Sequence, residues 1–132
     1  RTERYRLNAR DFAEMAELCG RTGLEGLTVW GEPSPYHATV EMSYLAFARF
    51  SWSPDLAWES FMAEDAAPRL GGLDAAREFF AIAGELDANQ VMDPERLRAL
   101  ANRAAAHRAE DEAGRRWLSL EDQIARRRYM GA

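Results

Sequence analysis

The stretch LEGLTVWGEPSPYHATVEMSYLAFARFSW, residues 24–52, joins a short apolar run, a polar loop and an apolar helix without a break. The run lies between Gly23 and Gly31, and its apolar members are Leu24, Leu27, Val29 and Trp30. This composition is typical of a β-strand that is buried on both faces. Such a strand must pair its backbone groups with neighbouring strands, and no other segment has comparable strand character. We therefore expect the rest of its sheet to be encoded outside these 132 residues, in a longer protein of which this chain is a part.

The segments on either side extend this pattern. Asn8 is a suitable N-cap for a helix that ends near Cys19, with Gly20 as its stop signal. A helix, a Gly-containing turn and a buried strand in this order predict one αβ unit of a parallel sheet. Residues 31–37 form a loop by their Gly and Pro content. Residues 38–50 are apolar on nearly every side, as expected for a buried helix.

The remainder of the chain is predicted to be helical. Pro68 kinks or closes one helix, and Gly71-Gly72 interrupts it. Residues 93–95, Asp-Pro-Glu, supply the N-cap, the first helical position and a first-turn acid of a long helix. Gly114 is expected to break that helix before a final one begins.

The predicted fold class is mainly α, a bundle of about five helices over residues 38–130 preceded by one αβ unit. We divide the chain into a helix-strand-loop unit at residues 1–37 and a helical domain at residues 38–132. A chain of 132 residues suffices for one domain, or for a piece of one.

Composition excludes several classes of function. The net charge of −5 argues against a nucleic-acid surface, and no apolar run approaches the roughly 20 residues that a membrane span needs. All 17 basic residues are Arg, which removes lysine-dependent nucleophilic and phosphate-loop chemistry. His37 and His107 are far apart in sequence, so neither a metal site nor a cofactor is expected. Cys19, the one cysteine, is expected to be a buried structural thiol, and the compartment is left open.

The best candidate site lies just beyond the predicted strand, where parallel-sheet enzymes hold their sites. Its expected substrate-binding residues are Trp30, Glu32, Tyr36, His37 and Glu41. A Trp offers a flat apolar face to a sugar ring, and a Glu accepts hydrogen bonds from hydroxyls or acts as an acid or base. The alternative is that Trp30 is core and Glu32 a solvated loop carboxylate. Glu41 lies on an apolar helix, so it either faces the same cleft or pairs with an Arg.

The run from the strand through the following helices resembles the closing part of a (β/α)8-barrel glycoside hydrolase, of the hexosaminidase-like or glucuronidase-like kind. The residues that carry the resemblance are Trp30 at the strand end, the run Glu41-x-x-Tyr44-Leu45-Ala46-Phe47, Trp52-x-Pro54 and Trp58-Glu59-x-Phe61. The resemblance implies that residues 24–30 are the last barrel strand and that a helical appendage follows. It also implies that the catalytic acids lie on earlier strands, so the fragment is catalytically incomplete alone.

The sequence is compatible with two functions. The first is a C-terminal fragment of a carbohydrate-active glycoside hydrolase, which binds a carbohydrate substrate with pocket-wall residues and needs upstream polypeptide to complete its sheet. The second is a non-enzymatic helical protein-interaction module whose strand is lent to a partner chain. Pairing of residues 24–30 within a barrel, or across a dimer, distinguishes the two.

Overall fold

The computed structural model describes residues 6–29, 37–88 and 91–130. These residues form helices and loops, with no strand among them, which confirms the predicted mainly helical bundle. The elements are α1 (Ala9–Thr22), α2 (Ala38–Trp52), α3 (Trp58–Phe61), the π-helical segment η2 (Met62–Ala66), α4 (Ala67–Leu70), α5 (Leu73–Ala88), α6 (Pro94–Ala105) and α7 (Glu112–Met130).

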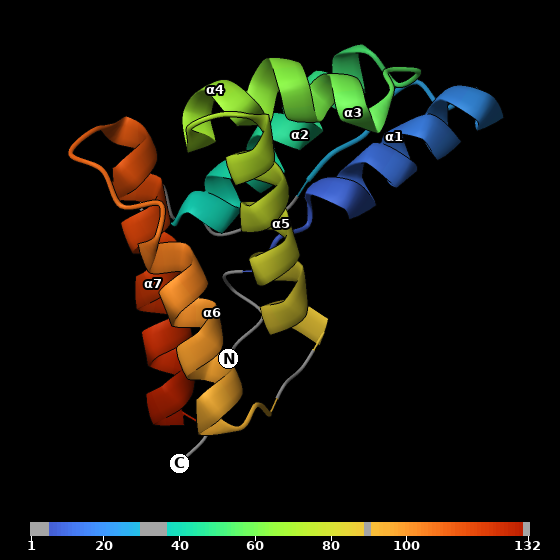
Figure 1. Cartoon of the computed structure of the whole chain (residues 1–132). Coiled ribbons are helices and arrows are strands. Elements are labelled where there is room, and N and C mark those ends of the chain that lie inside the picture. The colour runs from blue at the N-terminus through green and yellow to red at the C-terminus, as the bar shows by residue number, and fades with distance from the viewer. Residues whose placement is uncertain (1–5, 30–36, 89–90, 131–132) are drawn as a thin grey trace.

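The helices form two groups (Figure 1). Helices α1 to α4 lie across the top of the view, whereas α5, α6 and α7 run up and down beneath them, each antiparallel to the next. The Trp117 indole of α7 is fully buried where the groups meet, and its Nε1 donates a 2.9 Å hydrogen bond to the Leu70 carbonyl of α4. His107 stacks on this indole with ring centroids 4.1 Å apart. The aromatic core therefore joins the two groups.

Helices α1 and α2 pack side by side and run in the same direction. The Asn8 amide donates to Ser43 Oγ at 2.9 Å, and the Phe12 and Phe47 rings meet edge to face. Gly20, near the end of α1, lies against Pro54, just beyond the end of α2. Because the helices are parallel, the chain must return along the length of α1 before α2 begins. Residues 24–29 make the first part of this return.

The expected strand is not formed by the described residues 24–29. Among them only the Leu24 amide has a backbone hydrogen bond, to the Cys19 carbonyl at the end of α1. A strand needs a partner strand to pair with, and the described chain contains none. Burial on both faces is wrong as well, since the Leu24 side chain is 63% exposed. Leu27 is partly buried and packs against the core.

Pro68 does not end its helix. Helices α3 and α4 are joined through η2, which widens to the π-helical pattern just before the proline. The regular i→i−4 hydrogen-bond pattern is thus already interrupted just before Pro68, whose ring nitrogen has no N–H to donate. The interruption comes at Gly71, whose φ of 96° is in the left-handed region, as predicted for the Gly71-Gly72 pair.

The termini of α1, α6 and α7 partly follow the predictions. The Asp93 carboxylate accepts a 2.8 Å hydrogen bond from the Arg96 amide, which confirms the N-cap of α6. Gly23, at φ 72°, ends α1, whereas Gly20 stays helical and lies against Pro54. Gly114 lies inside the first turn of α7 rather than at a break. A Cβ there would overlap the backbone of Ala109, so Gly114 allows the α6–α7 loop to approach the helix.

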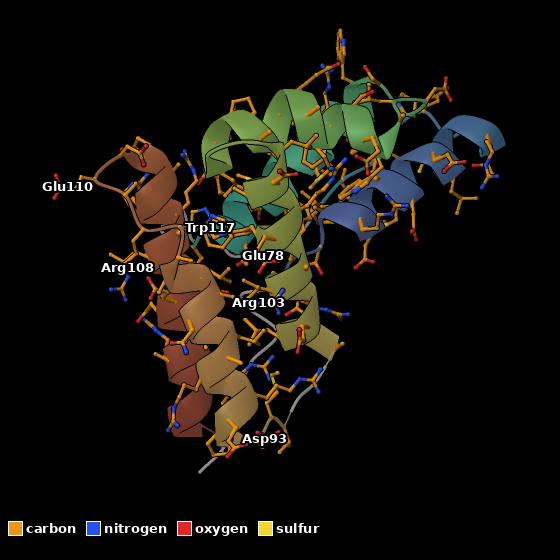
Figure 2. The ribbon with its side chains drawn as sticks, in the orientation of Figure 1. Glu78, Asp93, Arg103, Arg108, Glu110 and Trp117 are labelled. Atoms are coloured by element: carbon orange, nitrogen blue, oxygen red, sulfur yellow. The ribbon has the colours of Figure 1, made fainter. Side chains whose placement is uncertain are left out.

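Ion pairs hold the lower helices together. Arg103 on α6 donates to both oxygens of Glu78 on α5, at 2.7 and 3.0 Å, and Figure 2 shows the two side chains between these helices. Hydrogen bonding from Arg103 lowers the pKa of Glu78. Arg96 on α6 bonds Glu85 on α5 at 2.7 Å. The two bridges fix the register between α5 and α6.

Candidate functional site

The structure describes two of the five residues predicted to form the site. His37 and Glu41 are described, whereas Trp30, Glu32 and Tyr36 lie outside the described residues. His37 is the residue immediately before α2, and Glu41 lies one turn into that helix. Both face α7, but they contact different parts of that helix.

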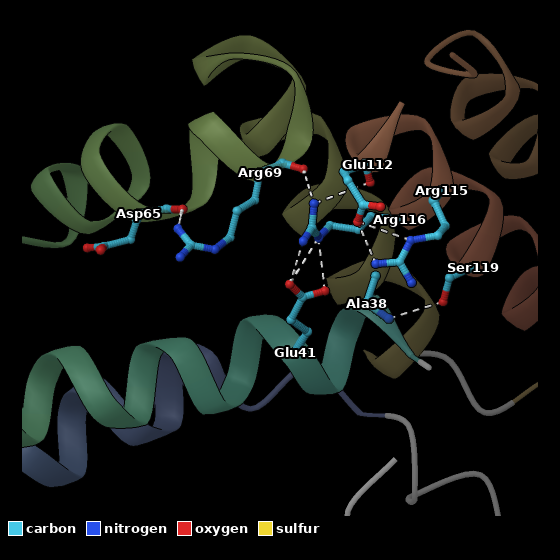
Figure 3. Close-up of polar contacts among 8 residues, drawn as sticks. All are labelled: Ala38, Glu41, Asp65, Arg69, Glu112, Arg115, Arg116 and Ser119. Atoms are coloured by element: carbon cyan, nitrogen blue, oxygen red, sulfur yellow. Dashed lines mark hydrogen bonds and ion pairs between the residues drawn. The ribbon is translucent and has the colours of Figure 1, made fainter. Parts of the chain in front are cut away.

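Glu41 forms a tight pair with Arg116 of α7 (Figure 3). Arg116 Nε lies 3.0 and 2.9 Å from the two carboxylate oxygens, and Nη2 lies 2.8 Å from Oε1. Arg116 Nη1 also donates to the carbonyls of Arg69 and Glu112, each at 3.2 Å. Hydrogen bonding to Glu41 raises the pKa of Arg116. Of the two sequence interpretations of Glu41, pairing with an Arg is therefore the observed one.

The start of α2 is held by polar side chains of the next two turns of α7. Ser119 Oγ accepts a 3.1 Å hydrogen bond from the Ala38 amide, one of the helix-end N–H groups that has no partner within the helix. The Gln123 amide nitrogen lies 2.9 Å from Thr39 Oγ1 and 3.5 Å from His37 Nδ1. Burial, with a contribution from the nearby Arg126 charge, lowers the pKa of His37. His37 is thus favoured as a neutral imidazole, which can donate and accept hydrogen bonds.

Sequence reasoning missed the contribution of α7 to this region. Arg116, Ser119 and Gln123 follow the i, i+3, i+7 spacing that puts residues on one helical face. This polar stripe lies beside the apolar residues Trp117, Leu120 and Ile124. Its spacing could have predicted a polar contact between this helix and another element. The arrangement fixes the position of the first turn of α2 against α7.

A second feature, not predicted from sequence, is an apolar groove between α6 and α7. Its volume is about 620 Å³, and its floor includes Leu97, Ala101 and Ala125. A smaller hollow of about 330 Å³ lies between α1 and the turn after α2, where Arg10 covers the Trp58 ring at 4.7 Å. One face of Trp58 is therefore covered by Arg10.

Comparisons with known proteins assign no class. No family model, curated protein or solved structure matches the chain. Within the described ranges, no three His, Cys, Asp or Glu side chains gather in a way that could hold a metal ion. None of the described helices combines the length and apolar character needed to cross a membrane.

Proposed function

We propose that this chain supplies the last α–β–α portion of a (β/α)8 barrel, together with a helical domain, in a carbohydrate-active glycoside hydrolase. In this proposal α1 and α2 are neighbouring barrel helices, and residues 24–30 are the strand between them. The remaining strands belong to the upstream polypeptide. Trp30 and Glu32 then contribute to the wall of the sugar pocket.

The observation that carries the proposal is the parallel packing of α1 and α2. In a (β/α)8 barrel each strand runs antiparallel to the helices that precede and follow it, so consecutive helices are parallel neighbours. A two-helix hairpin with a short loop would give antiparallel neighbours instead. The contacts of Asn8 with Ser43, and of Gly20 with Pro54, are those of parallel neighbours, which supports the proposal.

Two further observations support it. The described backbone of residues 25–29 makes no hydrogen bond to another described backbone group, so it is available for pairing in a sheet. The helix α1 and the start of the return also expose large apolar side chains: Met15 is 45% exposed, Leu18 52% and Leu24 63%. A neighbouring barrel unit would cover such apolar surface.

The carbohydrate part of the proposal rests on the residues that follow the return. Trp30 and Glu32 come directly after residues 24–29, at the C-terminal end of the proposed strand, which is the end at which barrel enzymes hold their substrates. Ser119 and Gln123 contact Ala38 and Thr39, the first residues of α2, which follow Trp30 and Glu32 in the sequence. The helical domain would thereby buttress the pocket.

The test is a comparison of variants in the complete protein that contains this chain. Trp30→Ala and Glu32→Ala are expected to lower kcat/KM on its preferred glycoside by about tenfold or more, equivalent to about 1.4 kcal/mol of transition-state binding. Trp52→Ala is the matched control, because Trp52 is at the opposite end of α2 and is 89% exposed. Unchanged kcat/KM on every glycoside tested, or no glycoside turnover by the intact protein, would contradict the proposal.

The alternative is a non-enzymatic helical interaction module, and the open groove between α6 and α7 favours it. The groove is mainly apolar, as is typical of surfaces that receive an amphipathic helix. The two functions differ in the fate of residues 24–29, which pair with barrel strands only in the hydrolase. A structure of the complete protein without a barrel would select the module.

A further inference from the structure

The groove between α6 and α7 continues along α7 into a second hollow. Pro94, Arg98 and Ala125 line the first part, and the second part lies beside the α6–α7 loop at Glu110. Leu118 and Arg108 line both parts. Leu118 is 56% exposed and lies where the two parts meet. The outer face of the α6–α7 hairpin is thus one apolar surface with Leu118 near its middle.

Most charged side chains around this surface are paired within the chain. Arg108 binds both oxygens of Glu121 at 2.7 and 2.6 Å, Arg115 binds Glu112 at 2.7 Å, and Arg126 binds Asp122 at 2.8 Å. Arg98 and Glu110 differ: both are exposed, and neither has an ion pair or side-chain hydrogen bond within the described part of the chain. Arg98 and Glu110 are thus exposed charges of opposite sign with neither contact, whereas Asp111, which also lines the second part and forms no ion pair within the described residues, accepts a 2.7 Å hydrogen bond from the Gly114 amide.

The two unpaired charges lie on opposite sides of Leu118. Arg98 lines the groove with Ile124, six residues after Leu118, whereas Glu110 lies beyond Glu112, six residues before it. A rise of about 1.5 Å per residue places each group about 9 Å or more from Leu118 along the helix axis. Figure 2 shows Glu110 at the tip of the α6–α7 loop, at the opposite end of the hairpin from Asp93 and the start of α6.

We propose that the outer face of α6 and α7 is a self-association surface, whose occupant is a second copy of this chain related by a two-fold axis near Leu118. A two-fold axis that crosses α7 at Leu118 aligns the two α7 helices antiparallel. It places Arg98 of each copy at the same level along α7 as Glu110 of the other, and it brings the two Leu118 side chains together. This match is the self-complementarity that a two-fold interface requires.

The size of the surface sets the expected strength. Helix α7 has 19 residues, which gives a length of about 28 Å, and two helices side by side are about 20 Å wide. The footprint is therefore roughly 560 Å² for each copy and about 1,100 Å² for the pair, which is at the low end of specific interfaces. We expect a reversible dimer that forms in the micromolar range. The inference does not depend on the hydrolase proposal, because α1 and residues 24–29 take no part in it.

The test uses charge reversal in the full 132-residue chain, followed by sedimentation velocity and light scattering from low micromolar to submillimolar concentration. Arg98→Glu and Glu110→Arg should each weaken dimerisation by about tenfold or more, because each places like charges opposite one another. An equimolar mixture of the two variants should form a one-to-one dimer, since both cross-interface pairs are then opposite in charge. Leu118→Glu should be monomeric alone and in mixtures.

The controls are Arg21→Glu and Glu25→Arg, which make equal charge changes on exposed residues outside the groove and should dimerise as the parent does. A parent chain that is monomeric at all concentrations overturns the proposal. So does a dimer that survives Arg98→Glu and Leu118→Glu, because it would form through another surface. Failure of the mixed variants to associate overturns it as well.

Discussion

Arg116 of α7 donates three hydrogen bonds of 2.8 to 3.0 Å to the Glu41 carboxylate of α2, although the two residues are 75 positions apart in the chain. The Arg116 side chain is only 14% exposed. Its guanidinium also reaches the carbonyl of Arg69 at the end of α4. One side chain therefore ties together three elements, one of which carries the predicted site residue Glu41.

Removing this guanidinium should destabilise the fold. We expect Arg116→Ala to lower the free energy of unfolding by about 2 kcal/mol, because it leaves the half-buried Glu41 carboxylate without its partner. Arg116→Lys should recover only part of the loss, since an ammonium cannot reproduce the two-pronged contact. Urea unfolding followed by circular dichroism measures both. Arg115→Ala is the matched control, because its pair with Glu112 is exposed and should contribute less than about 0.5 kcal/mol. Equal losses at positions 115 and 116 would contradict the assignment.

Replacing glycine by alanine at two helical positions should change the free energy of unfolding in opposite directions. Gly114→Ala should cost more than about 2 kcal/mol, because its Cβ would overlap the backbone of Ala109 and a backbone cannot rotate away as a side chain does. Gly84→Ala on α5 has no atom within 4 Å of the new Cβ, so it should stabilise by roughly 0.5 to 1 kcal/mol. Thermal and urea unfolding provide the comparison. Stabilisation by Gly114→Ala would show that the α6–α7 loop does not approach α7.

Stability should fall below neutral pH partly through His37. Its pKa in the folded protein lies below the ordinary value of 6.5, chiefly because of burial. The unfolded chain therefore binds the proton more tightly, so stability decreases as pH falls from above 6.5 until the folded pKa is passed. His37→Gln should flatten this part of the stability profile, as measured by urea unfolding at a series of pH values.

The neighbours of His37 allow a sharper check of that prediction. Arg126 lowers the pKa of His37 and Asp122 raises it, so Arg126→Gln should move the pKa upward and Asp122→Asn should move it downward. A titration of the His37 ring by NMR measures both shifts. Shifts in the same direction, or a His37 pKa above 6.5 in the parent chain, would rule out the described surroundings.

Hydrogen exchange should distinguish residues 25–29 from the helices beside them. In the chain alone, their amides should exchange nearly as fast as unfolded peptide, because they make no hydrogen bond to a described backbone group. The amides in the middle of α2, which are bonded within the helix, serve as the internal control and should be strongly protected. If the chain completes a barrel as proposed, the same five amides should become protected in the full protein. Strong protection of residues 25–29 in the monomeric chain would contradict the description of an unpaired return.

Much of the helical architecture could be read from sequence because its signals are local. The Asp93-Pro94 start of α6, the Gly71-Gly72 stop after α4 and the apolar residues of α2 each act through neighbours within one or two turns. The π-helical passage through Pro68 could not be predicted, because either a kink or a stop fits the same residues. Gly114 was misread for a related reason. Its small size is required by the approach of Ala109, a packing contact and not a helix ending.

The sequence by itself determined that most of the chain is helical, and it singled out the unusual apolar run at residues 24–30, whereas Cys19, expected to be buried, is only partly so. Only the tertiary structure decided that Glu41 pairs with Arg116, that Ser119 and Gln123 hold the start of α2, and that α1 and α2 run parallel. Helix signals come from propensity and periodicity, which depend on nearby residues. Partners more than 70 positions apart are selected by how the helices pack, and residues 24–29 show the same limit: strand-forming side chains do not make a strand until another strand lies beside them.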